Sequence, residues 1–258
     1  MYQREFDAAF YIIKKAADVI RDGYFSTISI SYKEDKSPVT NIDKKVDELI
    51  RTYLMEQFPT YGILTEESKD DLSRLNKDYV WIIDPIDGTQ EFITHEYEFV
   101  TNIALAYKGE IVLALINVPL KNECYFAIKG EGAYLIKEDK KEQIHVSNIT
   151  SNIRVLSSPY HLSEEEKEYL EKYKDKFNSI SYAGAAYKAC LIASGKAEAS
   201  YRFTLACKEW DIAPCDLLVT EAGGYFFDIH KQKYTYNKEN VKVLHGFIMV
   251  NLEENYFD

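Results

Sequence analysis

The sequence predicts a mixed α/β (α+β) fold in which a hairpin-rich half precedes a half of alternating strands and helices. Between residues 80 and 136, apolar and β-branched segments are joined by short turns that contain Gly. From residue 153 onward, short apolar segments alternate with segments of helical periodicity, which implies a sheet layered between helices. With 258 residues, of which 46% are hydrophobic, the chain is long enough to bury a substantial core.

Two amphipathic helices are predicted to open the chain. Apolar residues recur at helical spacing over residues 4–21 and again over residues 40–58. Thr40 is expected to cap the second helix, with Asp43 at its third helical position.

An antiparallel run of strands follows. A short apolar strand is predicted at residues 80–83, and the segments 99–107 and 111–118 flank a turn at 108–110. The segments 123–128 and 132–136 flank a second turn at 129–131. This half is therefore expected to be rich in hairpins.

Residues 137–151 are polar and without apolar period, and they mark the expected boundary between a unit of residues 1–140 and a unit of residues 150–258. We expect the two units to form one compact catalytic body. In the second unit, strands are predicted at 153–157, 179–183 and 197–201. Helices are predicted at 163–177, 185–193 and 211–222, the last one ending at Gly223 and Gly224.

Composition excludes several classes of protein. A net charge of −11 argues against nucleic-acid binding, which requires clustered Lys and Arg. No apolar run reaches the length of a membrane helix, and the charged N-terminus does not resemble a signal peptide. The four cysteines form no CxxC pair, so we expect reduced thiols in a cytoplasmic protein.

Residues 81–89, WIIDPIDGT, place two carboxylates three residues apart where an apolar strand meets a turn. Pro85 restricts this turn, and Gly88 and Thr89 follow the second carboxylate directly. If a helix begins here, its free N–H groups can bind phosphate oxygens, and Gly88 allows the backbone to approach a ligand closely. Alone, an Asp-Pro-x-Asp-Gly sequence is more often a surface turn.

Further acidic residues lie at the ends of other predicted elements: Asp43, Glu66 and Asp211. Each alone is typical of a helix start or a solvated face, but together they match the oxygen ligands that Mg²⁺ prefers. The candidate ligands are Glu66, Asp84, Asp87, Asp211 and the backbone carbonyl of Ile86. Two cations about 3.5–4 Å apart in such a cluster would form a site for in-line phosphoryl displacement.

In combination, these segments resemble the lithium-sensitive, magnesium-dependent phosphatases of the inositol monophosphatase superfamily. The two signatures of that family are similar to WIIDPIDGTQEF at 81–92 and EWDIAPCDLLVTEAGG at 209–224. SPVTNIDKKVDELI at 37–50 and ILTEES at 63–68 match further segments in the same order. The resemblance covers residues 35–228 and implies a five-layered αβαβα sandwich of the sugar phosphatase type.

The resemblance also implies two or three Mg²⁺ ions per site. Glu66, Asp84 and the carbonyl of Ile86 would hold the first ion, and Asp84, Asp87 and Asp211 would hold the second.

Catalytic roles are implied in the same way. Asp43 would lie near a third, weaker ion. Glu66 and Thr89 would orient and deprotonate the attacking water, and the amides of Gly88 and Thr89 would hold the phosphate.

Within the superfamily, the chain looks most similar to the 3'(2'),5'-bisphosphate nucleotidases, which remove the 3'-phosphate from 3'-phosphoadenosine 5'-phosphate. Glu91 and Phe92 resemble the end of their GTKEF sequence, and Gly184 and Lys188 match the ends of their Gly-Ser-Ser-Leu-Lys segment. His161 matches the histidine of their Ser-Arg-Ser-His segment. The expected substrate contacts are Gly88, Thr89, Glu91, Gly184, Lys188 and Asp211.

Two alternatives remain open. Ala185 and Ala186 replace two hydroxyls of the nucleotidase segment, which favours an inositol or sugar phosphate monoesterase. A non-catalytic protein that binds metal or phosphate would be expected to lack a catalytic position, and every one is present. The expected partner is a small phosphorylated metabolite, and the resemblance allows a homodimer.

Overall fold

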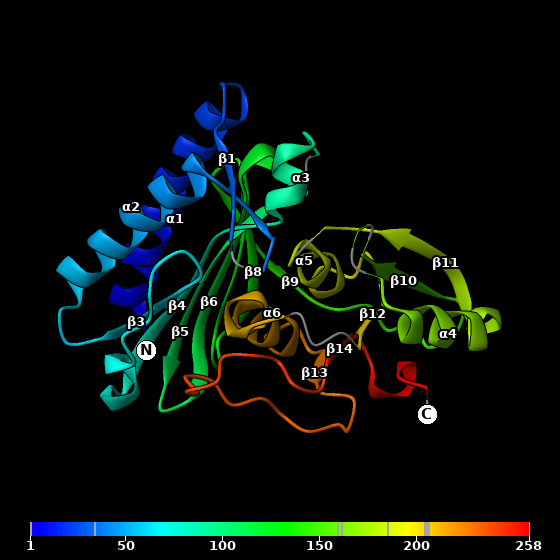
Figure 1. Ribbon diagram of the computed structural model, residues 1–258. Helices are drawn as coiled ribbons and strands as arrows, with labels where there is room; N and C mark the ends of the chain where they lie inside the picture. The colour runs from blue at the N-terminus through cyan, green and yellow to red at the C-terminus, as the bar shows by residue number, and fades with distance from the viewer. Residues whose placement is uncertain are drawn as a thin grey trace.

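Helices and sheets alternate through five layers in the computed structural model (Figure 1), which describes residues 2–33, 35–96, 98–158, 160, 162–184, 186–203 and 207–257. Helices α1 (Gln3–Tyr24) and α2 (Asn41–Gln57) cover one face of a seven-stranded sheet. Helices α5 (Tyr187–Ala193) and α6 (Glu209–Glu221) lie between its other face and a five-stranded sheet. Helix α4 (Glu164–Lys172) covers the outer face of that second sheet. The αβαβα architecture is thereby confirmed.

The large sheet is antiparallel except for its β3–β4 pair. In spatial order its strands are β3 (Gly62–Thr65), β4 (Tyr79–Asp87), β5 (Val100–Tyr107), β6 (Glu110–Val118), β7 (Glu123–Ile128), β8 (Gly132–Lys137) and β9 (Lys140–Ile144).

The second sheet is mixed. Its order is β11 (Phe177–Tyr182), β10 (Ile153–Ser157), β12 (Ala199–Arg202), β14 (Phe247–Val250) and β13 (Tyr225–Phe227). A two-stranded hairpin of β1 (Ile30–Tyr32) and β2 (Pro38–Thr40) precedes α2, and the short helix α3 (Thr89–Ile93) follows β4.

Alternation along β4 explains how one strand serves two cores. Val80 and Ile82 pack with α5 and α6, whereas Trp81 and Ile83 pack with α1 and α2. All four side chains are buried, because helices cover both faces of the sheet at this strand.

A β-bulge interrupts this alternation just before the end of β4. Asp84 pairs with Asn102 and Asp87 with Val100, so β4 uses three steps where β5 uses two. One extra residue reverses the side-chain alternation, which brings Asp87 to the same face as Asp84. Pro85 lies inside the bulge, where its missing N–H removes no regular ladder bond.

Several elements differ from the sequence prediction. Lys140–Ile144 forms edge strand β9 inside the predicted boundary, and its exposed, charged residues conceal the strand period. The predicted helix at 163–177 ends at Lys172, and Phe177 already begins β11. The predicted cap is confirmed: Thr40 accepts from the Asp43 N–H, and the Asp43 carboxylate accepts from the Thr40 N–H at 2.9 Å. In the described parts of the chain, every helix is too short or too polar to cross a bilayer.

Candidate active site

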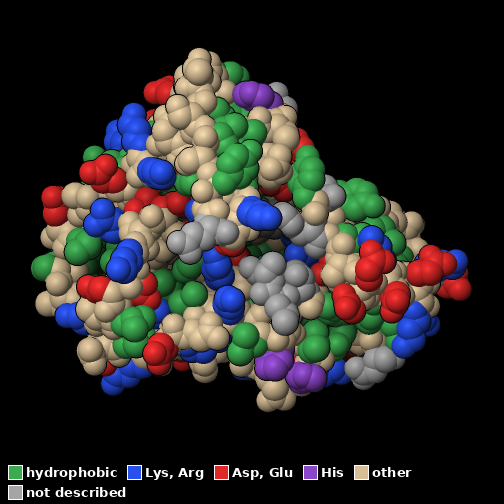
Figure 2. Space-filling model, viewed as in Figure 1, with side chains coloured by type: hydrophobic (Ala, Val, Ile, Leu, Met, Phe, Trp, Pro, Cys, Tyr) green, Lys and Arg blue, Asp and Glu red, His purple; other side chains and the backbone are tan. Residues whose placement is uncertain are grey.

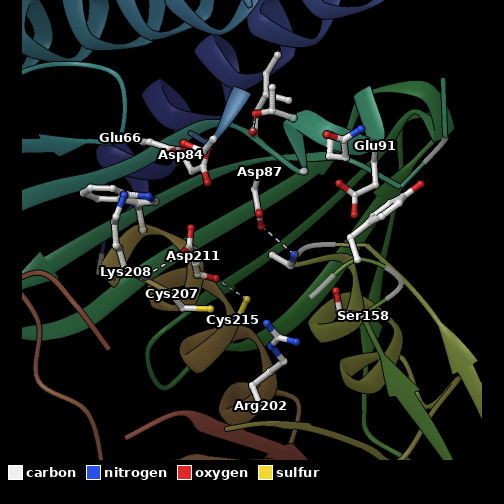
Figure 3. A pocket seen from close by; sticks show the side chains of 18 of the residues that line it. Glu66, Asp84, Asp87, Glu91, Ser158, Arg202, Cys207, Lys208, Asp211 and Cys215 are labelled. Carbon is white, nitrogen blue, oxygen red and sulfur yellow. Dashed lines mark hydrogen bonds between the residues drawn. The ribbon is translucent and has the colours of Figure 1, made fainter. Parts of the chain in front are cut away.

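Three of the predicted carboxylates converge at the C-terminal end of β4 and the start of α6 (Figure 3). Asp84 and Asp87 lie on either side of the bulge in β4, and Asp211 lies in the first turn of α6. One carboxylate oxygen from each residue lies within 4.8 Å of the other two. The structure therefore brings these three predicted ligands together.

Backbone and side-chain donors hold two of these carboxylates, whereas one oxygen of the third has no partner among the described residues. Asp87 accepts from the Asn102 side-chain amide at 3.1 Å and from the Ala186 N–H at 2.8 Å. Asp211 accepts from the Lys208 N–H at 2.7 Å. Asp84 is buried, and among the described residues its Oδ1 atom has no hydrogen-bond partner.

The carboxylates of the cluster repel one another electrostatically. Burial raises the pKa of Asp84, and the neighbouring carboxylates of Glu66, Asp87 and Asp211 raise it further. Burial also raises the pKa of Asp211, and it raises that of Asp87 to about 6. Converging oxygens with an orphaned buried acceptor suit a hard divalent cation such as Mg²⁺, which would relieve this repulsion. The set of carboxylate donors therefore fits divalent metal ions such as Mg²⁺.

Glu66, expected as another ligand, follows β3 directly and lies close enough to Asp84 to raise its pKa. Its Oε1 accepts from the Lys33 ammonium at 2.7 Å, and Glu67 accepts from the same ammonium at 2.7 Å. Burial lowers the pKa of Lys33, but its attraction to and hydrogen bonds with Glu66 and Glu67 together outweigh burial and raise the pKa overall. Glu66 is thus beside the cluster but paired with a lysine that the sequence did not point to.

Thr89 links two of the other predicted positions. Its hydroxyl lies 3.0 Å from Asp43 Oδ1 and 3.1 Å from the carbonyl oxygen of Ile86, so it can donate to either. Asp43 is buried, and burial raises its pKa against the opposing hydrogen bonds from Thr40. Gly88 precedes α3 with φ of 94°, a left-handed conformation that favours glycine.

A cleft of about 810 Å³ opens beside the cluster, and Glu91 and Lys188 both line it. The Lys188 ammonium is buried and donates to the carbonyl of Ala183 at 3.1 Å. Gly184 packs so closely that an added Cβ would lie 2.7 Å from the backbone oxygen of Glu98. Its N–H donates to the Glu98 carboxylate at 2.9 Å. His161, Ala185 and the other undescribed positions lie outside the residues for which this geometry is known.

Sequence reasoning missed several residues of the cleft. Lys and Arg side chains lie around the middle of the face shown in Figure 2. Besides the predicted Lys188, those that line the cleft are Lys36, Arg202, Lys208 and Lys242. Lys33 and Arg202 carry no local signal in the sequence, because their partners are distant. Asn102 could have been found, since Thr101 and Asn102 are adjacent polar residues inside an apolar strand.

Comparisons with known proteins find a matching family model and several similar proteins. The family model described as the inositol monophosphatase family matches residues 2–252. The 3'(2'),5'-bisphosphate nucleotidase CysQ of Aggregatibacter actinomycetemcomitans is 30% identical over 92% of this chain and 89% of its own. An inositol monophosphatase of Dictyostelium discoideum is 33% identical over 91% of this chain and 88% of its own. The crystal structure of CysQ from Bacteroides thetaiotaomicron superimposes with a TM-score of 0.84 at 31% identity, and it covers 97% of this chain and 98% of that one.

Proposed function

Because this chain belongs to the inositol monophosphatase family, we propose that it removes the 3'-phosphate from 3'-phosphoadenosine 5'-phosphate. At the coarser level, the chain is a metal-dependent phosphomonoesterase with an acidic metal-binding cluster. The finer proposal concerns which phosphate ester it accepts. It is supported by the CysQ relatives and by two buried cations that line the cleft.

Two buried cations carry the proposal. Lys188 and Arg202 line the cleft together with the three carboxylates, and both are buried. Burial lowers the pKa of Lys188, and the nearby positive charge of Arg202 lowers it further. Arg202 is paired with Glu166 at 3.2 Å, whereas Lys188 donates to a neutral carbonyl. A second phosphate on the substrate would neutralise the positive charges of Lys188 and Arg202. The cleft volume of about 810 Å³ is sufficient for a nucleotide.

The residues around the cluster can orient a water molecule for attack on phosphorus. Thr89 directs its proton toward Asp43 or Ile86, which leaves the Thr89 oxygen free to accept a hydrogen bond from a water. We propose Glu66 as the group that takes the proton of that water. Mg²⁺ held by Asp84, Asp87, Asp211, Glu66 and the carbonyl of Ile86 would supply Lewis-acid activation and charge neutralisation. The water oxygen would form a bond to phosphorus as its proton passes to Glu66, the bond to the 3'-oxygen would break, and that oxygen would take up a proton from solvent water and leave as the alcohol.

A second candidate, an inositol or sugar phosphate monoesterase, is favoured by two observations. The Dictyostelium discoideum relative, named an inositol monophosphatase, is 33% identical. Ala186 stands where the nucleotidases carry a hydroxyl that would help to bind the nucleotide. Its backbone N–H is already bonded to Asp87 and so does not replace that hydroxyl.

Phosphate release from matched substrates separates the two candidates. We expect a kcat/KM for 3'-phosphoadenosine 5'-phosphate about 10–100-fold above that for adenosine 3'-monophosphate, because the second phosphate gains a charged hydrogen bond. Lys188→Met should bring this ratio of kcat/KM values close to one, while turnover of the monophosphate should stay within a few-fold of the wild-type value. Faster turnover of inositol 1-phosphate than of either nucleotide would overturn the proposal in favour of the second candidate.

Other parts of the proposal rest on the same cleft. It is lined from both the 1–140 and the 150–258 units, so we propose that they work as one catalytic body. We propose two or three Mg²⁺ ions per site, with Gly88, Thr89 and Glu91 on the phosphate side. The cytoplasmic location and the homodimer stay predictions.

A further inference from the structure

A buried carboxylate on α2 is bonded to both ends of the segment that carries Glu66. Asp47 has an exposed fraction of only 4%. Its Oδ1 atom accepts from the Thr65 hydroxyl, and its Oδ2 atom accepts from the Ser68 hydroxyl at 2.5 Å. Thr65 and Ser68 directly flank residues 66–67, so the two oxygens of one carboxylate hold the segment on both sides.

Regular structure does not fix the position of residues 66–68. Strand β3 ends at Thr65, and the next three residues continue neither as strand nor as helix. The Glu66 N–H donates to the carbonyl of Ile83 at 3.3 Å, which is longer than most backbone hydrogen bonds. Side-chain contacts must therefore hold this segment, and those of Asp47 come from a helix that packs in the core.

Helix α2 provides a rigid frame for these contacts. Asp43 and Asp47 are four residues apart, so they lie on the same face of the helix. Asp43 contacts the Thr89 hydroxyl on one side of the cluster, and Asp47 reaches the segment after β3. Arg51, one turn further along α2, lies 3.6 Å from Asp47 and balances the charge of the buried carboxylate.

We propose that Asp47 is a positioning residue, which holds Thr65 and Ser68 so that the Glu66 carboxylate stays beside the metal cluster. Figure 3 shows Glu66 next to Asp84. Residues that orient metal ligands without binding the metal typically change metal affinity or activity by about 10–100-fold when they are replaced. The inference rests on the proposed role of Glu66 as a metal ligand.

The first test measures Mg²⁺ binding to the full chain by isothermal titration calorimetry, without substrate. Asp47→Ala should bind Mg²⁺ about tenfold more weakly than the wild type, because the segment loses both contacts. Glu48→Ala is the matched control, since it removes the same charge from the next position of α2, where the side chain is exposed. Equal Mg²⁺ affinities of Asp47→Ala and Glu48→Ala would overturn the inference.

The two hydroxyl donors allow a second test that keeps Asp47 in place and decides the matter if Asp47→Ala does not fold. Thr65→Val combined with Ser68→Ala should also bind Mg²⁺ about tenfold more weakly, whereas Thr65→Ser, which keeps the hydroxyl, should bind as the wild type does. Adding Asp47→Ala to the double variant should cause no further loss, because all three changes break the same contacts. Wild-type affinity of the double variant would contradict the proposal. A cooperative unfolding transition of each metal-free variant shows that it is folded.

Glu66→Gln distinguishes a failure of the inference from a failure of the proposed ligand set. In the Glu66→Gln background, Asp47→Ala should change Mg²⁺ affinity by less than about twofold, because Asp47 acts through Glu66. If Asp47→Ala weakens binding equally with and without Glu66, the ligand assignment stands and positioning through Glu66 is wrong. If Glu66→Gln itself binds Mg²⁺ as the wild type does, the ligand assignment fails and the inference fails with it.

Discussion

Replacement of Asp84 by Asn should have opposite effects on stability with and without metal. Burial and the neighbouring carboxylates raise the pKa of Asp84, so the folded chain holds this proton more tightly than the unfolded chain does. The wild type therefore loses stability as pH rises from the ordinary value of 3.8 toward the raised value. Asn has nearly the same shape, carries no charge, and can donate to the adjacent carboxylates.

The size of the effect follows from the geometry. Two unit charges 4.8 Å apart repel by about 0.9 kcal/mol in a water-like medium and about 3.5 kcal/mol at an effective dielectric constant of 20. Asp84 has two such neighbours, Asp87 and Asp211. Because proton uptake limits the repulsion, we use the water-like value for each neighbour, which gives a total of about 2 kcal/mol. Mg²⁺ at one hundred times its dissociation constant adds about 2.7 kcal/mol to a protein that binds it only when folded.

Urea unfolding at pH 8 and pH 4, with and without Mg²⁺, measures both terms. Without metal at pH 8, Asp84→Asn should be about 2 kcal/mol more stable than the wild type, and the difference should shrink at pH 4. With Mg²⁺ the wild type should gain stability that the variant does not. Phosphate release by the variant should fall by about 10²–10³-fold. Retained turnover at saturating Mg²⁺, or a variant less stable than the wild type at pH 8 without metal, would refute the reasoning.

Three further changes test other parts of the structure. Thr89→Val removes the hydroxyl that contacts Asp43 while keeping the shape of the side chain. It should lower kcat by about 10²-fold with Mg²⁺ affinity unchanged. A kcat within threefold of the wild type in steady-state assays would contradict the role of Thr89 in orienting the water. Burial raises the pKa of Asp216 from 3.8 to about 6, so the wild type should lose up to about 3 kcal/mol as pH rises through that range. Asp216→Asn should remove that loss, and parallel pH profiles of unfolding free energy for the two proteins would exclude it. Gly184→Ala places a Cβ 2.7 Å from the backbone oxygen of Glu98 and should cost about 1–3 kcal/mol in urea unfolding, whereas an unchanged midpoint would show that the segment moves freely.

Residues whose partners are close in the chain were predictable from the sequence. The Thr40 cap with Asp43 is an example, because both residues lie in one turn of helix and follow a known spacing. The apolar segments of the hairpins were found for the same reason, since their period is local. The joint occurrence of Asp84, Asp87 and Asp211 at element ends suggested a shared metal site, and the family resemblance assigned each residue to an ion, because nothing local says that α6 packs against β4.

The rest of the site depends on contacts that no local pattern encodes. Lys33 meets Glu66 across 33 residues of chain, and Arg202 meets Glu166 across 36. Strand β9 was missed because its exposed Lys and Glu residues conceal the alternation, although its backbone pairs regularly with β8. Pro85 indicated a turn, whereas it lies within a strand that continues through the bulge.

The bulge in β4 makes the number of residues between two aspartates as important as their identity. If one residue were inserted between Asp84 and Asp87 and the strand kept a single bulge, both aspartates would remain, but the pleat would direct Asp87 toward α1 and α2. That carboxylate would then enter an apolar core, and the metal cluster would lose a member without any ligand being substituted. Single-residue insertions in this segment should therefore be counted with ligand substitutions when an inactive homologue is recognised from its sequence.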